Sequence, residues 1–147
     1  MTARSSDPIF RKISQDPFAR WLGIELLELR PGYGRLAMTL TQQMLNFHGI
    51  PHGGAIFSLA DAAFAAASNS HGQTAFALSM TISYLAATPP GTRLLAEAQE
   101  LRKGHRAGFY EIKVRTEGGD LVATCQAVVH RKGESFVEPD GERTPHA

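Results

Sequence analysis

The hydrophobic positions of residues 24–70 predict two strands followed by one apolar helix. In IELLELRPGYGRLAMTL, residues 24–40, a Pro31-Gly32 turn separates two strand-like runs, and apolar residues recur at every second position of the later run. After a loop, residues 55–70 are rich in alanine, which favours helix, and are apolar nearly all the way round. A helix of this kind is normally buried on every side.

Four more extended segments follow this helix, at residues 74–87, 92–103, 107–118 and 120–133. Gly104 and Gly118-Gly119 are typical of hairpin turns, so we expect the segments to form an antiparallel meander. A curved antiparallel sheet wrapped around one long buried helix, an α+β fold, would cover most of that helix. One sheet of this size leaves part of it exposed, which favours self-association.

The chain divides into an N-terminal helical segment over residues 1–20, one main domain over 21–132 and a tail over 133–147. Asp7 before Pro8 is typical of a helix start, and we expect one short amphipathic helix whose apolar side includes Phe18. The tail is charged and contains prolines, so we expect it to be disordered.

Composition and charge narrow the possible partners. A net charge of +1 over 147 residues gives no electrostatic argument for nucleic acid or an anionic membrane. The single cysteine, Cys125, excludes an intrachain disulfide and fits a reducing compartment. No apolar run resembles a signal peptide or a membrane span, so we expect a cytoplasmic protein. The histidines lack the spacing of metal ligands, and no metal site is expected.

Asp61 stands out because it is the only Asp, Glu, Lys or Arg in the stretch from Leu36 to Thr92. An Asp on a helix usually lies on a solvated face. This helix has no such face, and an ionised carboxylate buried without a partner is costly and tends to have a raised pKa. Such a residue either meets a partner from elsewhere or lines a cleft where its basicity is used. We interpret Asp61 as a functional residue.

The sequence His52-Gly53-Gly54 lies where that helix begins. The first N–H groups of a helix have no acceptor within the helix, and the helix dipole is positive there. Glycine lets a ligand approach the backbone closely, so the turn can stabilise a developing oxyanion. The three residues alone are more commonly a plain glycine-containing turn that enters a helix.

The spacing of the whole stretch is more specific than any of its parts. Its pattern, N-x2-G-x2-H-G-G…L-A-D…N, is made by Asn46, Gly49, His52, Gly53, Gly54, Leu59, Ala60, Asp61 and Asn69. This pattern resembles the hotdog-fold thioesterases, specifically the phenylacetate-degradation-type acyl-CoA thioesterases. The resemblance runs from about Trp21 to Lys132, includes the segment KGHRAGFYEIKV, and implies the hotdog fold.

The resemblance also implies roles for individual residues. Asp61 would act as general base on a water or as nucleophile on the thioester carbonyl, and Gly53 N–H would bind the carbonyl oxygen. Asn46 would position the water or the thioester, and His52 would support the loop and the carbonyl. Sites of this family form between subunits, so a dimer or a dimer of dimers (a homotetramer) is expected. No metal or organic cofactor is implied, because coenzyme A is part of the substrate and product.

Other residues are expected to bind the substrate. Gly54 belongs to the same loop as Gly53. A basic hairpin suits the phosphates of coenzyme A, as the resemblance also implies, and it contains Lys103, Gly104, His105 and Arg106. Some family members carry a hydroxyl residue on the strand that faces the Asp. Here Ala77 takes that position, and Ser79, next along the same face, is the candidate.

The function expected from these residues is hydrolysis of an acyl-CoA with an aromatic or medium-chain acyl group. One alternative is a hotdog enoyl-CoA hydratase or dehydratase, in which His52 would work with a carboxylate. Another is a non-catalytic acyl-CoA-binding module, which would need no buried base. Cys125 lies among alternating apolar residues and is interpreted as a core residue rather than a nucleophile.

Overall fold

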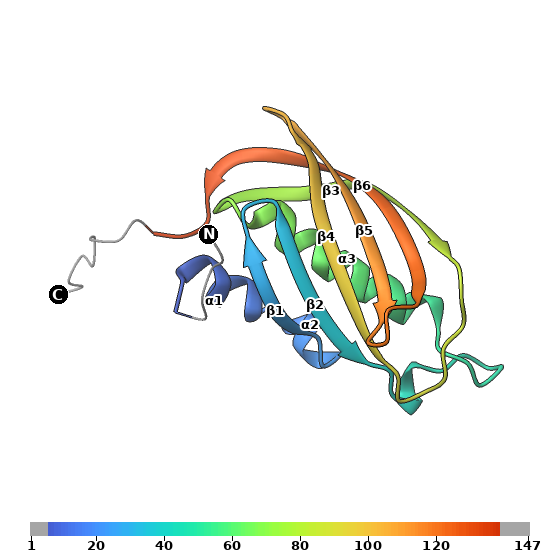
Figure 1. The fold of residues 1–147 in the computed structure, drawn as a ribbon. Helices are drawn as coiled ribbons and strands as arrows, with labels where there is room; N and C mark the ends of the chain where they lie inside the picture. Colours follow the sequence, from blue (N-terminus) through green and yellow to red (C-terminus); the bar gives the residue numbers. More distant parts are fainter. Residues whose placement is uncertain (1–5, 139–147) are drawn as a thin grey trace.

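A six-stranded antiparallel sheet curves around one long helix in the computed structural model, which describes residues 6–138 (Figure 1). The helices are α1 (Pro8–Ser14), α2 (Pro17–Trp21), the short 3-10 helix η1 (Gln42–Met44) and α3 (Gly53–Asn69). The strands are β1 (Glu25–Arg30), β2 (Tyr33–Thr39), β3 (Gln73–Tyr84), β4 (Arg93–Lys103), β5 (Ala107–Thr116) and β6 (Leu121–Ser135). The expected α+β architecture is confirmed.

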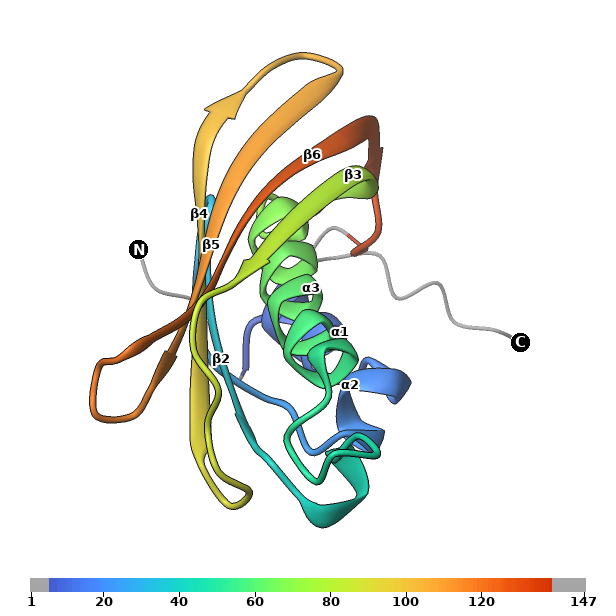
Figure 2. The same cartoon turned by 90° about the vertical axis from the view of Figure 1, so that its right-hand side faces the viewer.

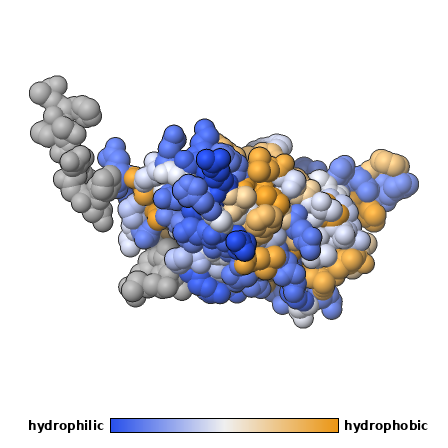
Figure 3. Space-filling model, turned by 90° about the horizontal axis from the view of Figure 1, so that it is seen from above, coloured by the Kyte–Doolittle hydropathy of each residue, from blue (hydrophilic) through white to orange (hydrophobic). Residues whose placement is uncertain are grey.

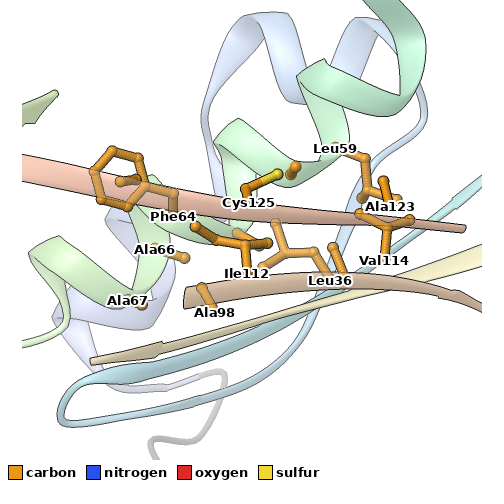
Figure 4. Close-up of a cluster of buried hydrophobic side chains, with 14 of the residues drawn as sticks. Leu36, Leu59, Phe64, Ala66, Ala67, Ala98, Ile112, Val114, Ala123 and Cys125 are labelled. Carbon is orange, nitrogen blue, oxygen red and sulfur yellow. The ribbon is translucent and has the colours of Figure 1, made fainter. Parts of the chain in front are cut away.

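The core lies between α3 and the inner face of the sheet, as the side view shows (Figure 2). Inward positions of the central strands alternate along the chain, so that Ile112 and Val114 of β5 are fully buried while Lys113 is exposed. They pack with Leu59 and Phe64 of α3 in the cluster drawn in Figure 4. Half of the buried positions of α3 are alanine, which lets the helix and the sheet approach closely.

The strand order β1-β2-β4-β5-β6-β3 corrects the expected four-strand meander. Only β4, β5 and β6 form one, and β3 instead pairs with β6 at the sheet edge. The segment after β3 crosses to the other side, where Leu40 N–H donates to Thr92 O (2.9 Å) and Gly91 N–H donates to Leu40 O (2.7 Å). These bonds place β4 beside β2, and among residues 6–138 β3 has only β6 as a neighbour.

Two helices replace the single one expected before residue 22. Asp16 accepts a hydrogen bond from Ala19 N–H (2.9 Å) and caps α2, just as Asp7 caps α1 through Ile9 N–H (2.8 Å). Each cap precedes a proline at the first helical position. The chain therefore turns at Asp16, and Phe18 is 57% exposed instead of lying on a buried side.

The C-terminal boundary also differs from the expected one at Lys132. Strand β6 continues to Ser135, and Phe136 N–H donates to Gly72 O (3.2 Å), so these residues belong to the domain. The rest of the expected tail, 139–147, and residues 1–5 lie outside the described residues. Within the described part of the chain, no helix is both long and apolar enough to span a membrane.

Candidate active site

Asp61 lies half-buried in the middle of α3. Within residues 6–138 its carboxylate takes part in no ion pair and no hydrogen bond. Burial raises the pKa of Asp61, and the negative charge of Asp16 raises it further. The carboxylate is therefore a stronger base than an ordinary Asp, and no cation of the described chain compensates it.

The N-terminus of α3 keeps one backbone donor free. His52 caps the helix, because its Nδ1 accepts from Gly54 N–H (2.9 Å). Ala55 N–H and Ile56 N–H both donate to His52 O, at 3.0 and 3.5 Å. Of the first four helical N–H groups, only that of Gly53 has no acceptor among the described residues. Gly53 N–H is thus the free backbone donor of this turn, whereas Gly54 N–H, expected to meet substrate, is occupied by the His52 ring.

Tyr84, at the end of β3, holds the same turn from the other side. Its hydroxyl donates to Gly53 O (2.9 Å), and a Cβ added to Gly53 would lie 3.1 Å from the Tyr84 ring. The Gly53–Gly54 peptide is therefore held at both ends, by Tyr84 at its oxygen and by His52 at its N–H. Sequence reasoning gave Tyr84 no such role, because no local pattern links two residues from separate elements.

Asn46 folds the loop that leads into α3. Its Oδ1 accepts from His48 N–H (2.9 Å) and Ile50 N–H (3.3 Å), which closes a tight turn. His52 N–H donates to Met44 O (2.7 Å) and joins this turn to the helix cap. The Nδ2 group of Asn46 has no acceptor in the described chain, so it is free to meet a ligand.

A single subunit does not bring the expected catalytic residues together. Asp61 and Gly53 are eight positions apart on one helix, which separates them by about 12 Å along its axis. A carbonyl bound at Gly53 N–H is therefore out of reach of Asp61 of the same chain.

Ser79 does not share a face with Ala77. A bulge lies between them, since Ala77 is aligned with Val129 and Ser79 with Val128. After the bulge Met80 packs against the core, so Ser79 points to the opposite side. The alternation used to select Ser79 breaks at this point, and its role stays a prediction.

The basic hairpin lies near the other end of the sheet. Gly104 is required there, because a Cβ would lie 2.6 Å from Ala107 O. His105 and Arg106 are exposed and line a polar cavity of about 460 Å³. We call this the basic cavity; its other lining residues are His130, Arg131, Lys132, Gly133 and Glu134. Sequence reasoning missed the histidine, arginine and lysine of β6, which had no signal other than their charge.

A polar cluster of Glu100, Tyr110 and His71 lies beside the C-terminal end of α3, and sequence reasoning missed it as well. Glu100 accepts hydrogen bonds from Tyr110 Oη (2.5 Å) and pairs with His71 Nε2 (2.9 Å). Burial alone would raise the pKa of Glu100, but the hydrogen bonds from Tyr110 and His71 lower it. Nearby, Ser70 Oγ donates to Ala67 O (2.6 Å) and accepts from Gly32 N–H (2.8 Å).

Cys125 is buried in the core, as its alternation predicts, and burial raises the pKa of its thiol to about 11. The thiolate required of a nucleophile is therefore disfavoured. No three His, Cys, Asp or Glu side chains gather as metal ligands in residues 6–138.

Comparison with known proteins gives a consistent family. The model of the Thioesterase superfamily matches residues 48–123. The acyl-coenzyme A thioesterase PaaI of Escherichia coli is 41% identical over 118 residues, which cover 80% of this chain and 84% of that protein. The structure of the Escherichia coli PaaI protein from the phenylacetic acid degradation operon superposes with a TM-score of 0.83 at 38% identity, covering 87% of this chain and 93% of that one. A mutant of the phenylacetic acid degradation protein PaaI from Thermus thermophilus superposes with a TM-score of 0.76 at 40% identity, over 79% and 99% of the two chains.

Proposed function

The chain belongs to the PaaI-like acyl-CoA thioesterases of the thioesterase superfamily, and from that premise we propose that Asp61 and Gly53 N–H carry its thioester hydrolysis. The observation that carries the proposal is the half-buried Asp61 carboxylate with a raised pKa and no cation beside it among residues 6–138. A group of this kind is a competent base or nucleophile at neutral pH.

Two routes are open to the carboxylate. As general base, Asp61 takes a proton from water while the water oxygen attacks the carbonyl; the C–S bond then breaks and the leaving thiolate receives that proton. As nucleophile, its oxygen attacks directly, expels the thiolate and forms a mixed anhydride that water hydrolyses. In both routes the negative oxygen accepts from Gly53 N–H, a contact of the kind that contributes about 100- to 1,000-fold in rate. Neither route needs a metal or an organic cofactor.

The Asp61 carboxylate of one copy meets the Gly53 N–H of another if the two copies pair through β3. This strand is a long sheet edge, and its exposed side chains include Phe76, Leu78 and Tyr84, at 50%, 64% and 50% exposure. An exposed apolar edge strand is a template for pairing with another chain. Apolar side chains are also exposed on the face seen from above in Figure 3, the side on which β3 and β6 lie in Figure 1. The proposed pairing would bring Asp61 of one copy to Asn46, His52 and Gly53 of the other.

Antiparallel pairing also gives the basic cavity a role. His130 is aligned with Phe76 in the β3–β6 pairing, and Tyr84 lies at the far end of the same strand. A two-fold axis across β3 would therefore carry the cavity of one copy toward the Gly53 turn of the other. Arg106, His130 and Lys132 would then hold the phosphates of coenzyme A while the thioester reaches Gly53. Lys103, His105 and Gly104 would join them from the hairpin.

The acyl group is proposed to be aromatic or medium-chain. The hydratase alternative gains no support from the site, since the ring of His52 is engaged in capping α3. A non-catalytic module would have no use for an uncompensated carboxylate.

Thiol release from a panel of aliphatic, hydroxylated and aromatic acyl-CoAs tests the proposal. Asp61→Asn and Asp61→Ala should lower kcat by about 100- to 10,000-fold. Asp120→Asn, in an exposed turn, is the matched control and should keep wild-type turnover. Near-normal hydrolysis by Asp61→Asn for every thioester would refute the assignment. Absorbance with an enoyl-CoA in the same assay detects hydratase activity instead.

Asp61→Asn should be more stable than wild type at neutral pH. A raised pKa means that Asp61 destabilises the fold once the pH rises through its folded-state pKa, and asparagine removes that charge. Thermal melts at neutral pH measure the difference, which should disappear in acid where Asp61 is protonated.

The proposed pairing is tested by Leu78→Glu, which places a charge on the exposed edge. Sedimentation velocity should show a shift toward monomer together with loss of turnover. Leu101→Glu, at a side chain of similar exposure (61%) on β4, is the control and should change neither. An unchanged oligomer with Leu78→Glu would argue against β3 as the interface.

A further inference from the structure

A second cavity lies beneath the N-terminal helices, apart from the basic cavity. Its volume is about 530 Å³, which is within the range of roughly 300–1,000 Å³ that small-molecule sites occupy. It is bordered by the α1–α2 segment, β1 and α3, and Figure 2 shows the two short helices on the α3 side of the sheet. Its large apolar lining residues are Ile13, Ile24, Leu26, Leu36 and Phe136.

Small residues on α3 keep this cavity open. Ala62 and Ala65 lie one turn apart on the helix surface that faces it, and Ala65 is exposed although its helix is almost entirely apolar. The break between α1 and α2 contributes Gln15, Asp16 and Pro17 to the lining opposite. A larger side chain at position 65 would project into the space without meeting the core.

The cavity is next to the proposed catalytic carboxylate. Ala62 follows Asp61 in the chain, and Ala65 lies one helical turn beyond it, so all three share one side of α3. Asp16 lines the cavity, and its charge contributes to the raised pKa of Asp61. Asp61 therefore lies on the side of α3 that borders the cavity.

We propose that this cavity holds the acyl group of the thioester on which Asp61 of the same subunit acts. The N-terminal segment then sets the acyl specificity, while the other copy supplies the Gly53 turn. This inference rests on the proposed function. The lining favours an uncharged aromatic or medium-chain acyl group, because it is mainly apolar and its two charged side chains, Lys12 and Asp16, have opposite signs.

Ala65→Leu tests the proposal, with Ala87→Leu, the same substitution at an exposed alanine outside the cavity, as control. Ala65→Leu should lower kcat/KM for phenylacetyl-CoA and octanoyl-CoA by at least about 10-fold, as expected when a hydrophobic pocket loses room, and leave acetyl-CoA nearly unchanged. Ala87→Leu should resemble wild type with all three substrates. Equal losses with all three substrates, or no loss with any, would overturn the proposal.

Calorimetry with S-octyl-CoA, a thioether that cannot be hydrolysed, separates this inference from the proposed function. Ala65→Leu should weaken binding of S-octyl-CoA while binding of coenzyme A stays the same. If the wild type hydrolyses no acyl-CoA but this difference is seen, the cavity assignment holds and the proposed function fails. If wild type and Ala65→Leu bind S-octyl-CoA equally, the cavity does not hold the acyl group.

Discussion

The two ends of α3 differ in whether their polar groups have hydrogen-bond partners. At the C-terminal end, Asn69 donates to Ala65 O (2.9 Å) and accepts from Ala75 N–H (3.0 Å), and Ser70 bonds to the backbone on both sides. At the N-terminal end, within the part of the chain that the structure describes, Gly53 N–H has no acceptor. The half-buried Asp61 between the two ends has no cation beside it among residues 6–138.

Along one helix, this difference separates polar groups that stabilise the fold from polar groups that can act on a ligand. A satisfied cluster of buried polar groups fixes the helix against the sheet, and leaving one member unpaired there is costly. A free N–H and an uncompensated carboxylate contribute nothing of that kind, but they can act on a ligand. Substitutions at the two ends should therefore produce different losses.

Among substitutions that compare the two ends of α3, the largest expected effect is that of Gly53→Ala on turnover. The added Cβ would press on Tyr84 at 3.1 Å and move the free N–H, so kcat should fall by about 100-fold while the melting temperature changes little. Gly118→Ala, in an open turn, is the control. Thiol release measures the effect. A normal kcat in Gly53→Ala would show that the N-terminal end of α3 takes no part in hydrolysis.

Next is Glu100→Gln, at the C-terminal end. It should lower the free energy of unfolding by about 1–3 kcal/mol, because Tyr110 and His71 lose their ionised partner, and leave kcat per folded molecule unchanged. Glu100 has a lowered pKa, so its contribution is present above its unfolded-state pKa and is lost as the pH falls through the folded-state value. In urea melts, the difference in free energy of unfolding between wild type and Glu100→Gln should therefore become smaller in acid.

Exposed Glu117→Gln is the matched surface control and should change stability little. A fall in kcat with normal stability in Glu100→Gln would contradict the division between the two ends.

Tyr84→Phe should have a smaller effect on the N-terminal end. Losing one hydrogen bond to Gly53 O, worth about 0.5–1.5 kcal/mol, should lower kcat by up to about 10-fold with KM unchanged. Tyr33→Phe removes a hydroxyl that bonds Glu97 on another part of the sheet and should leave kcat alone. Equal kcat values for the two variants would show that the turn does not depend on Tyr84.

The smallest effect is expected from Asp16→Asn, which keeps the helix cap but removes a charge near Asp61. The acid limb of kcat/KM should lie above the pKa of an ordinary Asp, because Asp61 must be ionised to act. In Asp16→Asn the midpoint should move to lower pH, since the negative charge that raises the pKa of Asp61 is gone. A pH–rate profile measures the shift, and a move to higher pH would contradict the electrostatic account.

Local sequence patterns predicted the elements of this fold better than their pairing. Alanine content and periodicity located α3, and the glycine turns located the hairpins of β4, β5 and β6. The place of β3 depended on a pairing with β6 that no local pattern encodes. The turn at Asp16-Pro17 did carry a signal, since it repeats the Asp7-Pro8 start.

The site divides in the same way. The isolated charge of Asp61 and the glycines beside His52 were visible in the chain, and the family resemblance gave them roles. Tyr84, the β6 side of the basic cavity and the Glu100 cluster were not visible, because each joins residues far apart in sequence. The bulge before Ser79 was missed because a prediction from strict alternation of side chains along a strand does not allow for an extra residue.

The place of β3 in the sheet also has a consequence for how the protein is made. On the ribosome β3 emerges well before β6, the only strand beside it in the described chain, while β4 and β5 are synthesised in between. At a usual elongation rate of roughly 5–20 residues per second, its backbone groups wait seconds for that partner. A nascent chain that stalls before β6 would present a long unpaired strand, and chaperones should be needed most at that stage.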